Sequence, residues 1–578
     1  MEKITKIPSF KATEKEHTLN MDTKKFIPEY RRTSYKNKDR FNPGEIRRRR
    51  DEFRVKLRKE RQYQLLEKRR FEDTSSQSAS SSSNSGKSGS GYGSDLDEPQ
   101  ILPSLQSLQT ELTQWETTLN NSYDLQEQLG ALVRVRQLIL ENNNLTLSDT
   151  TMNIIFKYMK DCSLPMLQYE ALWAINNLSS GSHSRVATLI NNKIIQTLFN
   201  LFQKGKCDLE CQEHIIWTLG TIAGDCPEYR KLLYAQDPGV INLLVEVVMS
   251  WNIKELTGIK IPVSLRKITS WTFSNVFKSF ESYHLSQLNT HFITVLKTLL
   301  SSDDSEVVSN ICWALSYLSN KNVELANSLI INSEILPQLI HILQQHDINI
   351  TIPGLKVLGS ISSGTDAQTQ SLIDNNILSV FKDLVNTFDA NEYIIKQIYW
   401  IISNIVAGSS NQLKLVIQQG LIPKIVASLK PEASYMVRKE ACWVICNIIS
   451  RKDLTLEIFQ YMLLQRFITP LYRFIPDADP MLQNIILNTL EIIFQFGKRE
   501  TENDSQLSFN MFSSFIDQSC GTDILQDIQS NSSNEELSSK AAYLLDTYFN
   551  SNENDVEIDS KEPSLIPKVD GDRFQFEY

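Results

Sequence analysis

Residues 171–181 read ALWAINNLSSG, and related stretches return six times further along the chain. The later stretches are IIWTLGTIAGD at 215–225, SWTFSNVFKS at 270–279, CWALSYLSN at 312–320, LKVLGSISSG at 355–364, YWIISNIVAG at 399–408 and CWVICNIIS at 442–450. The tryptophan position recurs at intervals of 44, 54, 42, 43, 44 and 43 residues, with Lys356 taking its place once. Each stretch is apolar and free of strand-like alternation, which indicates a repeated helix.

A helical period of about 40–47 residues is typical of armadillo and HEAT repeats. The sequence therefore predicts an all-α fold, an armadillo-repeat superhelical solenoid of about ten repeats over residues 104–549. The single long interval contains Trp251 to Gly258 and indicates an insertion. Such a body is one elongated unit stabilised by contacts between neighbouring repeats.

Four further segments flank or precede this body. Residues 1–30 are polar and aperiodic, and we expect them to be disordered. Residues 31–71 are basic, and no helix breaker follows Pro43-Gly44, so a helix that needs a partner is expected from Glu45 to Phe71. Residues 72–103 form a flexible Ser/Gly linker, which spans roughly 30 Å on average. Residues 550–578 form an acidic tail.

The charge of the chain is divided unevenly between the basic segment and the rest. The 578 residues carry a net charge of −9, whereas residues 31–70 hold 17 Lys/Arg and 6 Asp/Glu, a net +11. The remainder must therefore carry −20. The basic segment either binds an acidic partner or folds back onto its own body; a solvated charged helix and a nucleic-acid arm are the alternatives. The acidic body disfavours nucleic-acid binding.

Several classes of protein are excluded by the sequence. No apolar run reaches the ~20 residues that span a bilayer, and we expect no secretory signal and no membrane insertion. The eight cysteines lack metal-ligand spacing, so no metal site is predicted. A phosphate-cradling loop, a GxSxG motif and an HExxH motif are all missing, so neither a catalytic residue nor a cofactor is predicted. His183 and His214 are interpreted as isolated surface groups, and a thiol nucleophile at Cys226 is disfavoured.

Helix phase predicts where the repeated tryptophans point. At 100° per residue, one apolar arc lies opposite Trp173. That arc comprises Ala171, Leu172, Ala174, Ile175 and Leu178. Asn176 and Asn177 flank the indole instead, and Trp400 repeats the pattern. We therefore expect the indoles to be exposed in a groove, although burial in the core is the usual place for a tryptophan.

A ladder of such indoles would bind an extended, lysine-rich peptide. The alkyl stems of Lys and Arg can lie between indole faces, and an Asn amide can both donate to and accept from a peptide backbone. Acidic residues beside the ladder would receive the ammonium groups. The candidates are Glu170, Glu213, Asp225, Asp366 and Glu440.

The Trp/Asn pairs, the basic segment RRRRDEFRVKLRKE, the linker and the acidic tail occur in an order that resembles importin α, the nuclear-import adaptor. The resemblance implies two sites for nuclear localisation signals. Its major site would comprise Trp173, Asn177, Gly181, Trp217, Asp225, Trp271 and Asn275. The minor site would comprise Asp366, Trp400, Asn404, Glu440, Trp443 and Asn447. Gly181 and Asp225 match the positions that hold the key signal lysine, and Tyr317 matches a family tyrosine.

Five positions depart from the family pattern. They are Thr221 and Ser360 in place of Asn, Val186 in place of Thr, Lys356 in place of Arg and Gln397 in place of Glu. These changes affect the expected affinity and signal preference.

The resemblance also implies partners. Importin β would bind the residues Arg47, Arg48, Arg49, Arg50, Arg54, Leu57, Arg58 and Lys59. The cluster Lys68, Arg69 and Arg70 would mimic a signal and inhibit the chain's own groove. Cargo proteins with basic signals, nucleoporins and a recycling exportin with Ran-GTP are the other implied partners, with shuttling between cytoplasm and nucleus. The alternative is a junctional or cytoskeletal armadillo scaffold, whose groove would instead be rich in Lys and Arg.

Overall fold

The computed structural model describes residues 105–549, except 142–144, 146, 162, 204–206, 279–287, 289, 322 and 504–509, together with 567–570 and 573–576. The described part of the body is helical, as predicted. The basic segment, the linker and the first 30 residues lie outside the described residues.

The helices follow one another along the chain with short connections. The first are α3 (Leu105–Asn121), α4 (Leu125–Glu141), α5 (Asp149–Lys160), α6 (Pro165–Ser179), α7 (His183–Asn191), α8 (Ile194–Gln203), α9 (Leu209–Asp225), α10 (Pro227–Tyr234), α11 (Val240–Leu256), α12 (Val263–Phe277), α13 (Thr290–Leu300), α14 (Ser305–Lys321) and α15 (Val323–Asn332). They continue with α16 (Ile335–Leu343), α17 (Ile348–Ser362), α18 (Asp366–Asp374), α19 (Ile377–Thr387), α20 (Glu392–Val406), α21 (Ser410–Gln418), α22 (Ile422–Ala427), α23 (Tyr435–Ile449), α24 (Leu456–Leu464), α25 (Ile468–Tyr472), the 3₁₀ turn η4 (Ile475–Asp477), α26 (Pro480–Asn503), α27 (Met511–Gln518), α28 (Gly521–Asn531) and α29 (Glu535–Tyr548).

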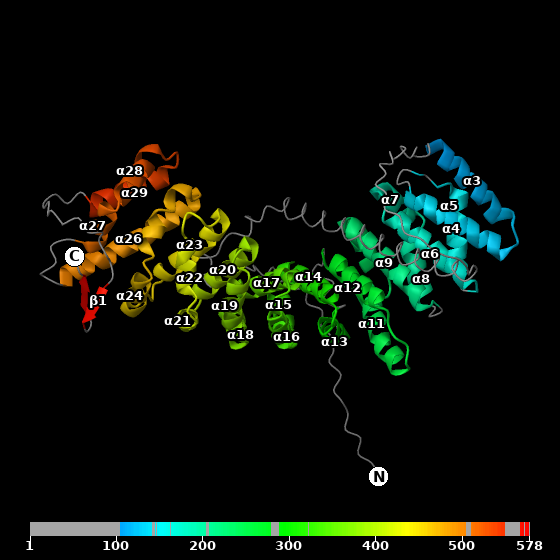
Figure 1. Cartoon of the computed structure of the whole chain (residues 1–578), viewed down its shortest axis with the longest axis horizontal. Helices are drawn as coiled ribbons and strands as arrows, with labels where there is room; N and C mark the ends of the chain where they lie inside the picture. Colours follow the sequence, from blue (N-terminus) through cyan, green and yellow to red (C-terminus); the bar gives the residue numbers. More distant parts are fainter. Residues whose placement is uncertain are drawn as a thin grey trace, which may run out of the picture.

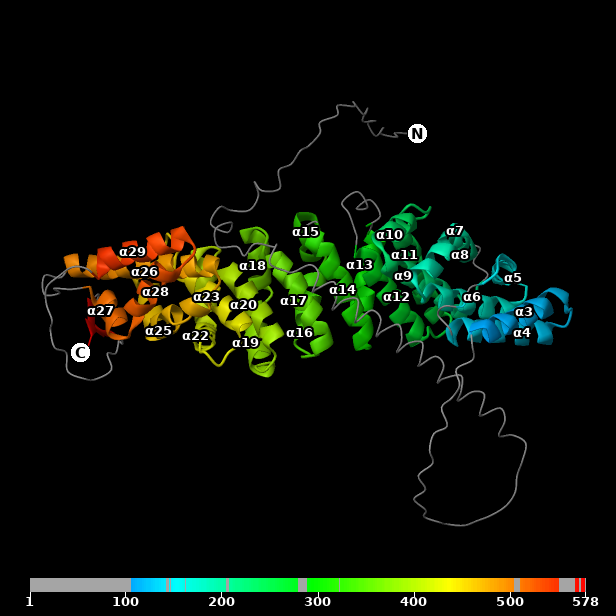
Figure 2. The ribbon, with the colours of Figure 1, turned by 90° about the horizontal axis from the view of Figure 1, so that it is seen from above.

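One helix from each repeat packs against its counterpart in the next repeat. This series, which we call the ladder helices, runs α4, α6, α9, α12, α14, α17, α20, α23, α26 and α29. Figure 1 shows a curved, elongated body in which α12, α14, α17 and α20 lie above α13, α16 and α18, on the concave side. Seen from above, the ladder helices lie side by side along the body (Figure 2). The ten ladder helices among the described residues agree with the prediction of about ten repeats.

The turn between the two shorter helices of a repeat is made in the same way in most repeats. A residue with positive φ stands there at Lys193, Glu334, Asn376, Gly420, Arg466 and Cys520. A single left-handed residue reverses the chain sharply, so each short helix begins directly after the previous one ends. Helix starts are also fixed locally. Thr365 with Gln368 caps α18, and Ser409 with Gln412 caps α21, through reciprocal side-chain and backbone hydrogen bonds.

The long interval between Trp217 and Trp271 is explained by α11. This helix has 17 residues, whereas its equivalents α8 and α13 have 10 and 11. Its end leaves Ile253 and Leu256 exposed at 67% and 88%. The insertion is therefore an extension of one outer helix and does not interrupt the ladder.

Two short strands follow the helices. β1 (Pro567–Asp570) pairs antiparallel with β2 (Arg573–Phe576), and β1 contacts α24. The sequence indicated only an acidic tail there. No helix among the described residues has both the length and the apolar character to cross a bilayer.

Candidate functional site

The recurring tryptophans all lie on ladder helices. Trp173 is on α6, Trp217 on α9 and Trp271 on α12, which together carry the predicted major site. Trp400 on α20 and Trp443 on α23 belong to the predicted minor site. The repeat therefore places the two predicted sites on two parts of one continuous row of helices.

The prediction that the indoles are exposed is wrong for four of them. Trp173, Trp217, Trp271 and Trp443 are 4%, 3%, 5% and 1% exposed. Trp400, like Trp313, is only half-buried. Helix phase describes packing within one repeat, and the apolar arc around Trp173 is indeed buried. It takes no account of the neighbouring repeats, which pack against the other sides of the helix.

Two glycines show how an indole packs against the neighbouring repeat. A Cβ on Gly220 of α9 would lie 2.7 Å from Cζ3 of Trp271, and a Cβ on Gly359 of α17 would overlap the ring of Trp400. The six-membered ring of each indole therefore lies against the backbone of the preceding ladder helix. The position is three residues after the tryptophan position of that helix, where a side chain would be in the way.

The asparagines that follow the tryptophans join neighbouring ladder helices. The Nδ2 bonds run from Asn177 to the carbonyl of Arg136 (3.3 Å), from Asn275 to that of Gly220 (3.0 Å), from Asn447 to that of Ser403 (2.9 Å), and from Asn404 to the Ser362 hydroxyl (3.2 Å). We expected each amide to offer both donor and acceptor to a peptide, and at least one N–H of each amide is used between the repeats.

The departures from the predicted pattern have structural consequences. Ser360 donates to the carbonyl of Ser319 at 2.7 Å, and so makes a bond between repeats like that of an asparagine. Thr221 donates instead within its own helix, to Trp217 at 3.0 Å. Val186 is buried and apolar.

A basic side chain of the chain itself lies on the first indole. Arg136 of α4 has its guanidinium carbon 3.8 Å from the ring centroid of Trp173. Its Nε donates to Glu170 at 2.6 Å, and both side chains are 4% exposed. Glu170 lies one helical turn before Trp173. The guanidinium is therefore held by a carboxylate and an aromatic face from one helix.

The His214 ring lies between the indoles of Trp173 and Trp217. Its ring is 5.6 Å from that of Trp173 at 24° and 6.4 Å from that of Trp217 at 6°, with Tyr169 edge-on at 5.0 Å. The interpretation of His214 as an isolated surface residue was therefore wrong, because the ring is buried and stacked. It occupies the kind of slot in which the stem of a bound lysine is expected.

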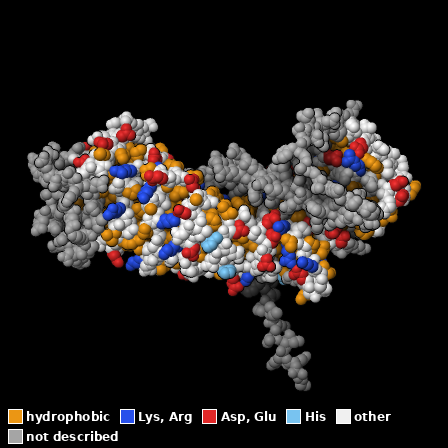
Figure 3. Space-filling view, in the orientation of Figure 1, with side chains coloured by type: hydrophobic (Ala, Val, Ile, Leu, Met, Phe, Trp, Pro, Cys, Tyr) orange, Lys and Arg blue, Asp and Glu red, His pale blue; other side chains and the backbone are white. Residues whose placement is uncertain are grey.

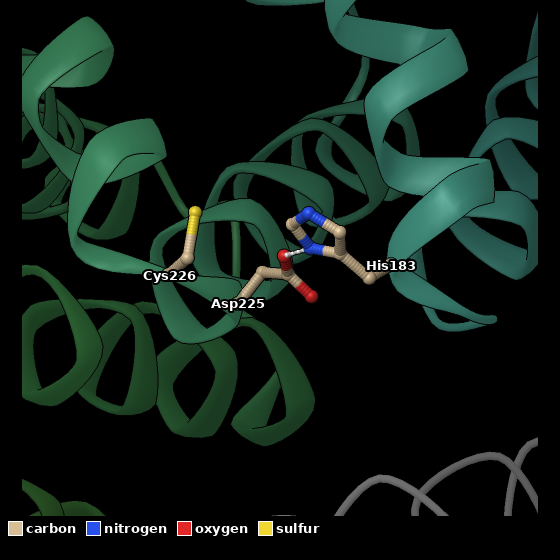
Figure 4. A group of neighbouring side chains, drawn as sticks. All are labelled: His183, Asp225 and Cys226. Atoms are coloured by element: carbon tan, nitrogen blue, oxygen red, sulfur yellow. Dashed lines mark hydrogen bonds and ion pairs between the residues drawn. The ribbon is translucent and has the colours of Figure 1, made fainter.

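Asp225, expected to receive the signal lysine, is paired with a histidine. Figure 4 shows His183 and Asp225 facing one another, with Cys226 beside them. His183 Nδ1 is 2.5 Å from Asp225 Oδ2, and the His183 ring stacks on Tyr229 at 5.4 Å. His183 is thus not isolated, and it holds the carboxylate that we assigned to the ligand.

The same three side chains offer possible metal ligands. One ligand atom from each of His183, Asp225 and Cys226 lies within 4.8 Å of the others. Burial raises the pKa of the Cys226 thiol, and the Glu228 and Asp225 carboxylates raise it further, against a backbone hydrogen bond that lowers it. Ligand spacing in the sequence gave no sign of this group, because its members come from two repeats.

Gly181 lies at the end of α6, where the chain turns toward α7. A Cβ there would lie 2.7 Å from Cδ of Arg185, whose Nη2 donates to the carbonyl of Leu145 at 2.9 Å. The buried Arg185 therefore fixes this turn and favours a residue without a side chain.

The predicted minor site repeats some of these features. The Lys356 ammonium is 5.5 Å from the Trp313 ring centroid and 5.9 Å from that of Tyr393. Glu440 is buried and precedes Trp443 by three residues, the spacing of Glu170 and Trp173. Asp366 begins α18, and its carbonyl accepts a bond from Gln412 at 3.0 Å.

Comparisons with known proteins relate these features to a family. Residues 31–133 match the model of the importin beta binding domain, and residues 290–320 and 409–450 match the armadillo/beta-catenin-like repeat. Importin subunit alpha-3 of Arabidopsis thaliana is 28% identical over 526 residues, which cover 90% of this chain and 92% of the relative. The chain is similar to importin α proteins over most of its length.

Other relatives extend the same pattern. Importin subunit alpha-1b of Oryza sativa is 28% identical and aligns over 68% of this chain and 70% of its own. Importin subunit alpha of Saccharomyces cerevisiae is 31% identical over 33% of this chain and 34% of its own. A crystal structure of an engineered protein covers 75% of this chain and 98% of its own with a TM-score of 0.60 at 19% identity, which shows the solenoid fold alone.

The sequence analysis missed Arg136, and it misinterpreted His183 and His214 as isolated surface groups. His214 could have been found, because it precedes Trp217 by three residues and so lies 60° from it, on the same side of the helix. Arg136 and His183 carry no such signal, since their partners come from other repeats.

Proposed function

We propose that this chain is a member of the importin α family and a nuclear-import adaptor. It binds basic nuclear localisation signals along the ladder helices and is linked to importin β through residues 31–71. The match to the importin beta binding domain supports the second part. The first rests on Arg136, because a guanidinium already lies between Glu170 and Trp173, the arrangement expected for a signal side chain.

The major site would be formed by α6, α9 and α12, with Asp225 receiving the key lysine. Charge-assisted hydrogen bonds between ammonium and carboxylate groups are among the strongest in proteins. A signal lysine would have to displace His183 from Asp225. The alkyl stems of the signal's lysine and arginine side chains would also have to share the space between Trp173 and Trp217 with His214.

The minor site would be formed by α20 and α23. Glu440 and Trp443 repeat the spacing of Glu170 and Trp173, so a second basic cluster can be held in the same way. Two such sites on one row of helices would bind monopartite and bipartite signals.

Recycling and inhibition complete the proposal. Lys68, Arg69 and Arg70 would compete for the groove, at an effective concentration on the order of mM set by the linker. The C-terminal repeats would bind the recycling exportin with Ran-GTP, and nucleoporins would be met during passage. The chain would then shuttle between cytoplasm and nucleus.

The decisive experiment is a titration of a lysine-rich signal peptide against Asp225→Lys. The substitution places a like charge where the ammonium binds, so we expect a loss of about 2 kcal/mol or more, roughly thirtyfold in affinity. Asp383→Lys makes the same charge change on the exposed face of α19 and should bind like the parent. Equal binding by both variants would refute the major site.

A junctional or cytoskeletal scaffold remains the alternative function, and repeating the titration with an acidic peptide separates the two. Such a scaffold would bind an acidic peptide, and Asp225→Lys would then strengthen binding. Figure 3 shows acidic and basic side chains interspersed on the visible face of the body, so the general surface charge does not favour an acidic ligand.

A further inference from the structure

His183, Asp225 and Cys226 come together where two repeats meet. His183 is the first residue of α7, Asp225 is the last residue of α9, and Cys226 caps the start of α10. The three potential ligand atoms lie within 4.8 Å of one another. In Figure 4 the imidazole and the carboxylate meet across the gap between the two repeats, with the thiol on the same side.

The chemistry of the three groups is that of a transition-metal site. Imidazole nitrogen, carboxylate oxygen and thiolate sulfur bind Zn²⁺ at about 2.0–2.3 Å. Tetrahedral coordination then needs donor atoms roughly 3.3–3.8 Å apart. The Nδ1 to Oδ2 distance of 2.5 Å must open by about 1 Å, and His183 can do this because its side chain is 65% exposed. Mg²⁺ and Ca²⁺ prefer oxygen ligands, so the imidazole and thiol disfavour them.

The surroundings also favour a cation. Tyr229 stacks on the His183 ring at 5.4 Å and 10°, which holds the orientation of the imidazole as partners around metal ligands do. The carboxylates of Asp225 and Glu228 act on the Cys226 thiol. The negative charge of these carboxylates attracts a divalent cation, and the thiol gives its proton to water when it binds the ion.

We propose that His183, Asp225 and Cys226 bind a divalent transition-metal ion, with Zn²⁺ as the expected occupant, and that the ion excludes the signal lysine from Asp225. The second part rests on the proposed function. Three protein ligands leave a fourth position to water. A divalent ion on Asp225 neutralises the carboxylate and repels a lysine ammonium at the same place, so cargo and metal bind alternately.

The test of the metal site is a titration of the full-length protein with Co²⁺, which reports thiolate ligation as a charge-transfer absorption. We expect one strong site whose absorption disappears on addition of Zn²⁺. Cys226→Ser should abolish the absorption and His183→Ala should weaken binding at least tenfold. Cys520→Ser, which removes an exposed thiol at the start of α28, should leave both unchanged. Absorption that persists in Cys226→Ser, or none in the parent, overturns the site.

The test of exclusion measures a signal peptide by fluorescence anisotropy with a chelator and with Zn²⁺. At about ten times the dissociation constant of the metal, simple competition raises the apparent Kd of the peptide about tenfold. Cys226→Ser should lose this effect and keep its affinity in chelator. Equal parental affinities in chelator and Zn²⁺ overturn the exclusion but not the proposed function. An absence of peptide binding in chelator refutes the proposed function, whereas the cobalt titration decides the metal site by itself.

Discussion

Single side chains in the ladder are committed to contacts within the protein. The buried pair of Arg136 and Glu170 illustrates the cost, because both charges are removed from water and depend on each other. Such a pair adds little net stability, yet breaking it leaves one buried charge uncompensated. The positions that most resemble a binding site are therefore also sensitive positions for folding.

We expect Glu170→Gln to lower the stability of the chain by about 3–5 kcal/mol. The matched control is Glu111→Gln, which breaks the pair of Glu111 with Arg134, where both side chains are 31% exposed. That change should cost at most about 1 kcal/mol. The midpoint of urea unfolding of the two variants checks this difference. Similar midpoints would mean that the burial of the first pair has no energetic consequence.

At the scale of helices and turns, local backbone geometry is repeated more faithfully than the sequence. The left-handed junction residue is Lys, Glu, Asn, Gly, Arg or Cys, so its position follows no residue type. Only Gly420 avoids the steric cost that other residues bear there. The other five junctions are maintained by the packing of the helices on either side.

Gly420→Ala should destabilise the chain by about 1–2 kcal/mol through backbone conformation alone. The glycine has φ +74°, and the only described atom near an added Cβ is the Lys382 ammonium at 3.9 Å. Gly130→Ala is the control of opposite sign. It lies within α4 with open space around it, so alanine should stabilise by about 0.5–1 kcal/mol. Thermal melts of the two variants should move in opposite directions.

The sequence predicted the helical repeat, the number of ladder helices and the place of the insertion, because each follows from the spacing of residues along the chain. It failed for the exposure of Trp173 and for the partners of Asp225. Those properties depend on side chains about 40 residues away, such as Arg136 and His183. Helix phase gives the direction of a side chain, whereas the neighbouring repeat determines what it meets.

At the scale of the whole molecule, the basic segment is proposed to compete with a signal peptide for binding to the ladder helices. Deletion of residues 1–103 should tighten the binding of a signal peptide, since a tethered competitor is removed. Addition of importin β to the full chain should have the same effect. Fluorescence anisotropy on the two forms checks this, with Lys68, Arg69 and Arg70 replaced by Ala as the matched variant. Equal affinities for all forms would exclude self-inhibition.

The C-terminal end requires a different design. Truncation at residue 520 would remove α28 and α29, whose buried Leu525, Leu544 and Leu545 belong to the core. We therefore use Asp523→Lys with Asp527→Lys, two exposed residues of α28. If this surface binds the exportin, the double variant should accumulate in nuclei while binding signals normally. Normal shuttling would count against that role, and Glu457→Lys on α24 is the control.

The contact of Trp271 with Gly220 and that of Trp400 with Gly359 each fix the spacing between two neighbouring ladder helices, one pair in each predicted site. The close spacing depends on the missing Cβ of each glycine, because a side chain there would push the next helix away. A bipartite signal is measured by the distance between its two basic clusters. Replacing either glycine by alanine would therefore change the distance between the two predicted sites. Signals with a different length of linker would then fit, although no residue that binds charge is altered.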